Sequence, residues 1–100
     1  MGSSKSGLEE KTVFAVKSVL KKYTQIQKVL LYGSRAKGNF KNGSDIDLTL
    51  VAPDLNTSDL LKIETDLEDL MLPYKIDLSL FHQIDNAELI EHINRVGVEF

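Results

Sequence analysis

The stretch GSRAKGNFKNGSDIDLTL, residues 33–50, joins a glycine-rich segment to an alternating one. Its first part holds three glycines and an Asn-Gly pair, which predict a loop with a helical turn near Arg35. Residues 45–51 then alternate between apolar and polar side chains, which predicts a strand with one buried face. Asp45 and Asp47 both lie on the polar face, where their charges repel each other unless a cation lies between them.

The sequence before this stretch predicts one helix and one strand. Residues 8–23 carry apolar side chains at helical spacing, which is typical of an amphipathic helix. Residues 28–32 form a short apolar run that ends at Gly33, and this pattern predicts a buried strand.

The sequence after residue 51 predicts helix, strand and helix. Thr57 or Ser58 is expected to cap the first of these helices, which carries apolar residues to Leu70 and ends before Pro73. The remaining two elements are a strand over residues 75–81 and a helix that begins after Asp85 or Asn86 and ends near Gly97.

These elements predict a fold of the α/β (α+β) class, in which one small mixed sheet packs against helices. Each strand alternates, so one sheet face is expected to be core and the other at least partly open. The chain has 100 residues, which fits one domain. Residues 1–7 are expected to be a disordered leader or an expression remnant, and residues 8–100 the folded domain.

Charge and cysteine content restrict the function classes. The formal net charge of -3 argues against a protein that coats nucleic acid, and no direct nucleic-acid binding is expected. The absence of cysteine excludes disulfides and thiolate metal sites and fits a cytoplasmic protein. Apolar runs reach about four residues, far short of the roughly 20 that cross a bilayer, so no membrane association is expected.

A third acid occupies the polar face of the next strand. Asp77 holds in residues 75–81 the position that Asp47 holds in residues 45–51. Taken alone, each acid is explained as a turn residue or an exposed strand position. Three acids on one face are less easily explained so, because acids are poor strand formers. A hard divalent cation such as Mg²⁺, which takes carboxylate and phosphate oxygens, would resolve the repulsion.

The start of the loop has the features of a phosphate site. Gly33 follows the buried strand and allows a ligand to approach the backbone closely. Ser34 offers a hydroxyl and an N–H where a helical turn begins, and Arg35 and Lys37 add positive charge. The alternative is a plain turn with solvated cations. The P-loop and dinucleotide-binding patterns are both absent.

The sequence alone assigns no catalytic or metal-binding role to the two histidines. His82 and His92 are each expected to be surface or packing residues, and no histidine pair or cysteine supports a zinc site.

The full combination resembles the minimal nucleotidyltransferases of the DNA polymerase β superfamily, over residues 8–100. In that family a hydrophobic strand is followed by Gly-Ser, about ten residues, Asp-x-Asp in the next strand and a third acid on a later strand. Here these parts read LLYGS, DID and KIDLSL. The resemblance implies a polymerase-β-like core and an ATP-binding transferase that moves a nucleoside monophosphate to a hydroxyl. The group expected to move is AMP, with ATP as its donor.

The resemblance also implies roles for the site residues. Asp45 and Asp47 would bind two Mg²⁺ ions, and Asp77 would ligate one of them and help to deprotonate the acceptor hydroxyl. Gly33 and Ser34 would hold the β- and γ-phosphates.

Two cations would assist at the phosphates by the same resemblance. These are Arg35 and Lys37, and Lys37 stands where the family often has arginine.

The resemblance implies a protein partner as well. Minimal members are often encoded beside a small helical HEPN protein, and some act as antitoxins that attach AMP to a tyrosine of that toxin. The alternative is a non-catalytic antitoxin that neutralises its partner by contact. A metal-sensing or structural α/β domain without nucleotide is the third possibility.

Overall fold

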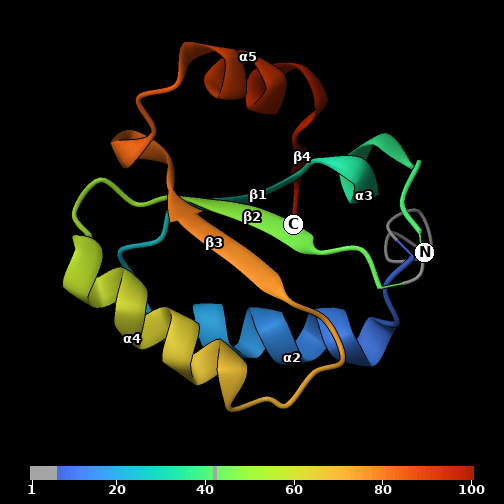
Figure 1. Cartoon of the computed structure of the whole chain (residues 1–100). Coiled ribbons are helices and arrows are strands. Elements are labelled where there is room, and N and C mark those ends of the chain that lie inside the picture. The colour runs from blue at the N-terminus through green and yellow to red at the C-terminus, as the bar shows by residue number, and fades with distance from the viewer. Residues whose placement is uncertain (1–6, 42) are drawn as a thin grey trace.

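The computed structural model of the chain describes residues 7–41 and 43–100 (Figure 1). Its elements follow in the order α2 (Glu10–Leu20), β1 (Lys28–Tyr32), α3 (Ser34–Lys37), β2 (Ile46–Val51), α4 (Thr57–Glu68), β3 (Ile76–Leu80), the 3₁₀ helix η1 (Phe81–Gln83), α5 (Ala87–Val96) and β4 (Val98–Glu99). The predicted alternation of helices and strands is confirmed, and η1 and β4 are additions to it. The expected leader lies outside the described residues, except for Gly7.

The four strands form one mixed sheet in the order β3-β2-β1-β4. β1 pairs antiparallel with both β2 and β4, whereas β2 and β3 are parallel and are joined through α4. In this register Asp47 lies opposite Tyr32 on one side and opposite Asp77 on the other. The pairing therefore brings the ends of three strands together at one point of the sheet.

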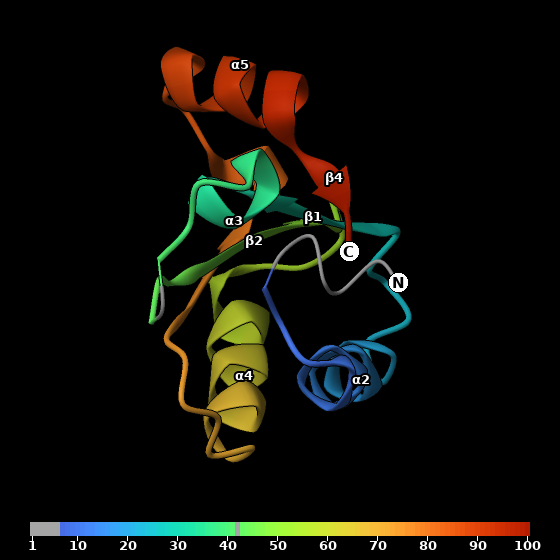
Figure 2. The same ribbon diagram turned by 90° about the vertical axis from the view of Figure 1, so that its right-hand side faces the viewer.

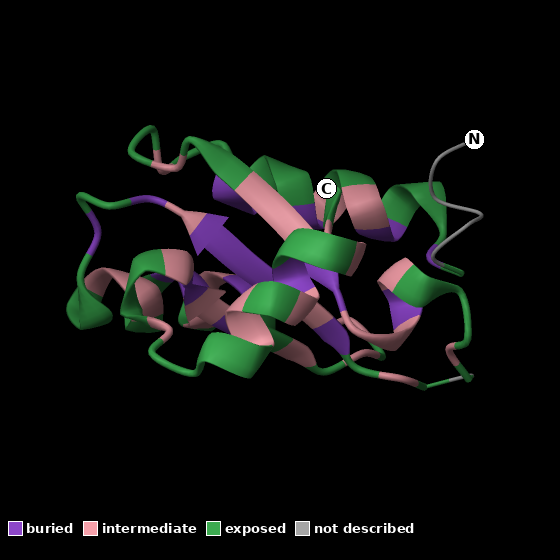
Figure 3. Ribbon diagram, turned by 90° about the horizontal axis from the view of Figure 1, so that it is seen from above, coloured by how far each residue is buried: buried purple, intermediate pink, exposed green. Residues whose placement is uncertain are grey.

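Helices cover the two faces of the sheet unequally. α2 and α4 lie against one face, and α5 lies over the other (Figures 1 and 2). The apolar residues of β2, which are Ile46, Leu48 and Leu50, are fully buried and belong to the core with residues of α2 and α4. Figure 3 shows the buried residues along the strands and exposed residues on the outer turns of the helices. The predicted small mixed sheet, packed on helices with one core face, is confirmed.

The cap of α4 differs from the predicted one. Asn56, and not Thr57 or Ser58, is the N-cap: its side chain accepts a hydrogen bond from the Asp59 N–H, and the Asp59 carboxylate accepts one from the Asn56 N–H. This capping box satisfies two amides that a serine or threonine one residue later would leave open. The last helix, α5, has Asn86 as its N-cap, one of the two predicted caps.

β4 was not predicted, because two residues are too short for a pattern. The chain leaves α5 at Gly97, where a Cβ atom would lie 2.4 Å from the Ile93 carbonyl oxygen, and a larger residue would therefore not fit. Val98 and Glu99 then pair with β1. α5 is thus held over the open sheet face at its carboxyl end.

None of the helices in the described part of the chain has the length and apolar character needed to span a membrane.

Candidate active site

The three predicted acids lie on the same side of the sheet. Asp47 and Asp77 are direct partners in the parallel pair β2–β3, and Asp45 precedes the first residue of β2. Asp47 is partly buried, and Asp45 and Asp77 are exposed. Because residues two apart in a strand share a face, Asp47 and Asp77 project away from the core that packs on α2 and α4, and Asp45 is near enough to Asp47 to raise its pKa.

The environment of Asp47 disfavours its charge. Burial raises the pKa of its carboxyl, and the negative charges of Asp77 and Asp45 raise it further, while His92 acts in the opposite direction. A carboxylate that is held near two others and partly out of water gains most from a bound cation.

The donor set fits a hard divalent ion, because it consists of carboxylate oxygens beside a candidate phosphate site. Within residues 7–41 and 43–100, however, no three acidic, histidine or cysteine side chains are gathered closely enough to hold a metal ion as they stand.

Gly33 lies directly against the Asp47 carboxylate. Its backbone has φ 76° and ψ -155°, a conformation that is essentially restricted to glycine. A Cβ atom at this position would lie 2.3 Å from the Asp47 Oδ2 atom. Gly33, the first glycine of the predicted phosphate loop, thus contacts the carboxylate of Asp47.

Ser34 and Lys37 occupy the two ends of the short helix α3. Ser34 begins the helix immediately after Gly33, and Lys37 ends it with an exposed side chain. The turn that was expected near Arg35 is this helix. Ser34 is therefore beside the acids by chain connectivity, and the ammonium group of Lys37 is accessible to a ligand.

Arg35, which was expected to assist at the phosphates, makes contacts within its own loop and with Tyr74. It is only 3% exposed, and its Nε and Nη2 atoms donate hydrogen bonds to the Ser44 carbonyl oxygen at 3.1 and 3.0 Å. The guanidinium also lies over the rings of Phe40 and Tyr74, 5.1 and 5.0 Å from their centroids. These contacts join α3 to the segments that lead into Asp45 and into Asp77.

Arg35→Lys is expected to lower the free energy of unfolding by about 1–3 kcal/mol, because lysine cannot donate two hydrogen bonds in one plane while it packs on two rings. Urea denaturation measures the change. Lys37→Arg is the matched control, since it alters an exposed cation of the same helix and should change stability by less than about 0.5 kcal/mol. Equal stability of Arg35→Lys and the unsubstituted protein would show that the guanidinium does not hold the loop.

The polar sheet face carries hydroxyl groups that the sequence analysis did not assign. Ser79 Oγ donates a hydrogen bond to Thr49 Oγ1 at 2.9 Å. Burial raises the pKa of the Tyr32 hydroxyl, whereas a hydrogen bond with Ser79 lowers it. Thr49 and Ser79 follow Asp47 and Asp77 by two residues, so the alternation of the strands predicts them on this face, and the structure confirms the placement.

His92 is a second residue that the sequence analysis left outside the site. It comes from α5, and its Nε2 atom accepts a hydrogen bond from the Gly33 N–H at 3.3 Å. Nothing in its sequence neighbourhood marks this contact, because it depends on how α5 packs over the sheet.

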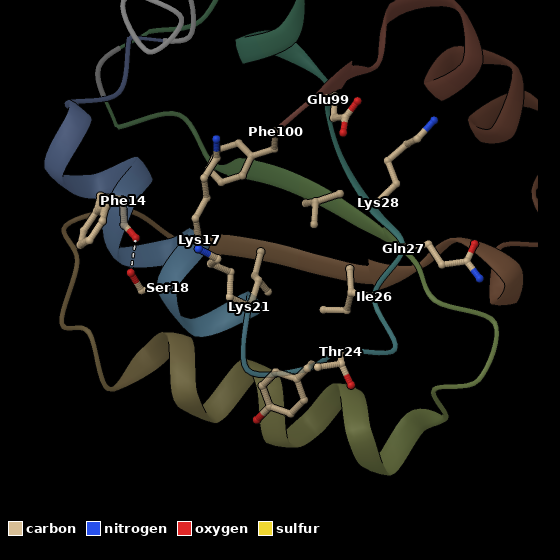
Figure 4. A pocket seen from close by; sticks show the side chains of 13 residues that line it. Phe14, Lys17, Ser18, Lys21, Thr24, Ile26, Gln27, Lys28, Glu99 and Phe100 are labelled. Carbon is tan, nitrogen blue, oxygen red and sulfur yellow. Dashed lines mark hydrogen bonds between the residues drawn. The ribbon is translucent and has the colours of Figure 1, made fainter.

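A larger cavity of about 630 Å³ lies away from the acids, beside α2, β1 and the residues of β4 (Figure 4). Phe14, Ile26 and Phe100 line it together with lysines, and Glu99 is the one acid among the lining residues of the described chain. A smaller cavity of about 330 Å³ beside α4 and β3 is bordered by Asp77. Asp45, Asp47, Asp77 and Gly33 do not line the larger cavity. It therefore lacks the carboxylates and the glycine backbone that a metal-bound phosphate would need.

Comparison with known proteins adds a family match. The family model described as "Polymerase beta, Nucleotidyltransferase" matches residues 15–100, which include all of the site residues above. A comparison with curated protein sequences found no match.

Solved structures of toxin–antitoxin complexes share the fold. One, a toxin–antitoxin with AMP-PNP, has a TM-score of 0.70 and 20% identity, over 92% of this chain and 72% of that chain. The toxin–antitoxin MntA-HepT has a TM-score of 0.68 and 17% identity, over 91% and 70%. A complex of tri-AMPylated Shewanella oneidensis HEPN toxin with MNT antitoxin has a TM-score of 0.61 and 17% identity, over 88% and 70%.

Proposed function

Because the chain belongs to the polymerase beta nucleotidyltransferase family, we propose that it transfers AMP from ATP to a hydroxyl group of a partner protein, with Mg²⁺ as the cofactor. The observation that carries the proposal is the register of the sheet. It sets Asp47 opposite Asp77 with Asp45 alongside, and it places the Gly33 backbone against the Asp47 carboxylate. Neighbouring carboxylates with a phosphate loop against one of them are what nucleotidyl transfer requires.

The acids would hold the metal. Asp45 and Asp47 would bind two Mg²⁺ ions, and Asp77 would ligate one of them. When bound, the ions would activate the attacking hydroxyl and neutralise the charge on the phosphates. Asp77 is exposed at the edge strand β3, so the acceptor hydroxyl can approach it and pass its proton to the carboxylate.

The loop would hold the leaving group. Backbone N–H groups of Gly33 and Ser34 would bind the β- and γ-phosphates, and Lys37 would add a positive charge from its accessible position. Arg35 would support the conformation of the loop from its buried position. The acceptor oxygen forms a bond to the α-phosphorus, the bond between the α-phosphorus and the bridging oxygen breaks, and pyrophosphate leaves.

The partner we propose is a small helical HEPN-type protein, and the acceptor is one of its tyrosines. One of the solved structures that match this fold is a complex of a tri-AMPylated HEPN toxin with an MNT antitoxin. By this proposal the chain is the antitoxin of such a pair and silences its toxin by covalent modification.

A non-catalytic antitoxin that acts by contact alone is the other candidate. Such a binder has no use for a carboxyl like that of Asp47, whose pKa is raised by burial and by the charges of Asp77 and Asp45. The cost of keeping Asp47 charged favours the enzyme.

Incubation with ATP, Mg²⁺ and the HEPN-type partner tests the proposal. Label from the α-phosphate of ATP should appear on the partner, and label from the γ-phosphate should not. EDTA should abolish the labelling. A stable complex that carries no label would instead support the contact antitoxin, and absence of any ATP affinity by calorimetry would support a structural domain.

A further inference from the structure

The imidazole of His92 lies at the phosphate end of the proposed site. Its Nε2 atom accepts a hydrogen bond from the Gly33 N–H at 3.3 Å, and its ring meets the Tyr32 ring edge to face, with centroids 6.3 Å apart and an angle of 80°. It is also near enough to Asp47 to oppose the rise in the pKa of that carboxyl. One side chain of the last helix thus reaches the glycine amide and the surroundings of the central acid.

The packing of α5 holds His92 in this position. The next residue, Ile93, is 1% exposed, and α5 is amphipathic with Asn86 as its cap. At its other end, Gly97 turns the chain into β4, which pairs with β1. The helix lies over the sheet face that carries the acids (Figures 1 and 2). The contact with Gly33 is therefore part of the folded arrangement of two anchored elements.

The amide that His92 occupies is one that a phosphate would use. As an acceptor, Nε2 carries no proton, and the proton of the ring is on Nδ1. One N–H cannot donate fully to an imidazole nitrogen and to an anionic oxygen together. When a phosphate oxygen accepts the hydrogen bond of the Gly33 N–H, Nε2 of His92 is left beside that oxygen. The two atoms then attract each other only if Nε2 carries a proton and donates it in a hydrogen bond.

We propose that His92 is a further nucleotide-binding residue, which releases the Gly33 amide when a triphosphate enters and donates its own ring N–H to the same phosphate group. The inference rests on the proposed function and names a recognition residue within its site. In the free protein, His92 accepts the Gly33 hydrogen bond that the phosphate oxygen accepts in the complex. In the complex, His92 donates a hydrogen bond to that phosphate.

Calorimetric titration of the full chain with AMP-PNP and Mg²⁺ tests the role. His92→Ala should weaken binding by about tenfold, which is the lower range for a hydrogen bond to a charged group. His92→Gln keeps an N–H donor near the Nε2 position and should recover part of the loss. His82→Ala, an exposed histidine of η1, is the matched control and should bind like the unsubstituted protein. Adenosine, which has no phosphate, should bind all four proteins equally.

The ring nitrogens provide a second readout that does not depend on folding differences between variants. In ¹⁵N-labelled protein, Nε2 of His92 should be unprotonated without ligand and protonated with AMP-PNP and Mg²⁺. Equal or tighter binding by His92→Ala, or a Nε2 atom that stays unprotonated in the complex, overturns the inference and leaves the proposed function in place. Failure of the unsubstituted protein to bind AMP-PNP overturns both.

Discussion

Asp47→Asn is expected to reduce AMP transfer by about 10³-fold or more and to leave the fold intact. Asp47 is the central acid, since it lies opposite Asp77 in the sheet and follows Asp45 on the same face. The amide that replaces it has the same size but no charge, so it cannot neutralise a divalent ion between the strands. Turnover with α-labelled ATP, at saturating Mg²⁺ and partner, measures the loss.

The same substitution is expected to stabilise the protein in the absence of metal. Burial and two neighbouring carboxylates raise the pKa of Asp47 above its usual value, so the folded state binds protons more tightly than the unfolded state. The charged form therefore destabilises the fold, and this effect is absent at low pH and grows as pH rises through the raised pKa. Asp47→Asn should have the higher melting temperature at pH 7 with EDTA, and the difference should shrink on acidification.

Asp54→Asn is the matched control for both measurements. Asp54 is exposed in the turn after β2, at the end of the strand away from Asp47. This substitution should change neither transfer nor melting temperature. Unchanged transfer by Asp47→Asn would remove Asp47 from the mechanism. A lower melting temperature with EDTA would show that burial and repulsion of the Asp47 charge do not destabilise the fold.

Gly33→Ala is expected to lower transfer by about 10²-fold or more and the free energy of unfolding by about 1–3 kcal/mol. The new Cβ atom would lie 2.3 Å from Asp47 Oδ2, and φ at this position is 76°. The carboxylate is the end of a side chain and can turn away, so the clash moves the central acid more than the backbone. Strain lowers stability, and the displaced carboxylate lowers activity.

Gly38→Ala separates these two causes. Gly38 also has a positive φ, 84°, but nothing lies within 4 Å of where its Cβ atom would be. It should therefore lose about 1–2 kcal/mol of stability and keep its transfer rate at temperatures where it is folded. If Gly38→Ala and Gly33→Ala lose transfer equally, loop strain, and not contact with Asp47, explains the loss.

Periodicity was enough to predict most of the fold and the placement of the acids. Alternation in residues 45–51 and 75–81 assigns the aspartates to one face, because the strand period of two leaves no other arrangement. Glycine and proline residues then indicate where the helices and strands end. The same alternation places Thr49 and Ser79 on the acidic face, where the structure shows them hydrogen-bonded to each other.

The features that sequence patterns missed depend on contacts between distant segments. Composition predicts Arg35 only as a cation near the phosphates, and it does not predict the contacts with Phe40, Ser44 and Tyr74 that the structure shows. Burial of an arginine in its own loop leaves no trace in local composition. His92 reaches Gly33 across 59 residues of chain, through the packing of α5, and no spacing rule predicts such a contact.

Crystals grown with AMP-PNP and Mn²⁺ test the central claim most directly, because Mn²⁺ can be located by anomalous scattering. The account predicts metal peaks roughly 2.0–2.6 Å from carboxylate oxygens of Asp45 and Asp47, with the triphosphate against Gly33 and Ser34. Nucleotide bound in the 630 Å³ cavity beside α2 and β1, with no metal peak at the aspartates, would contradict it.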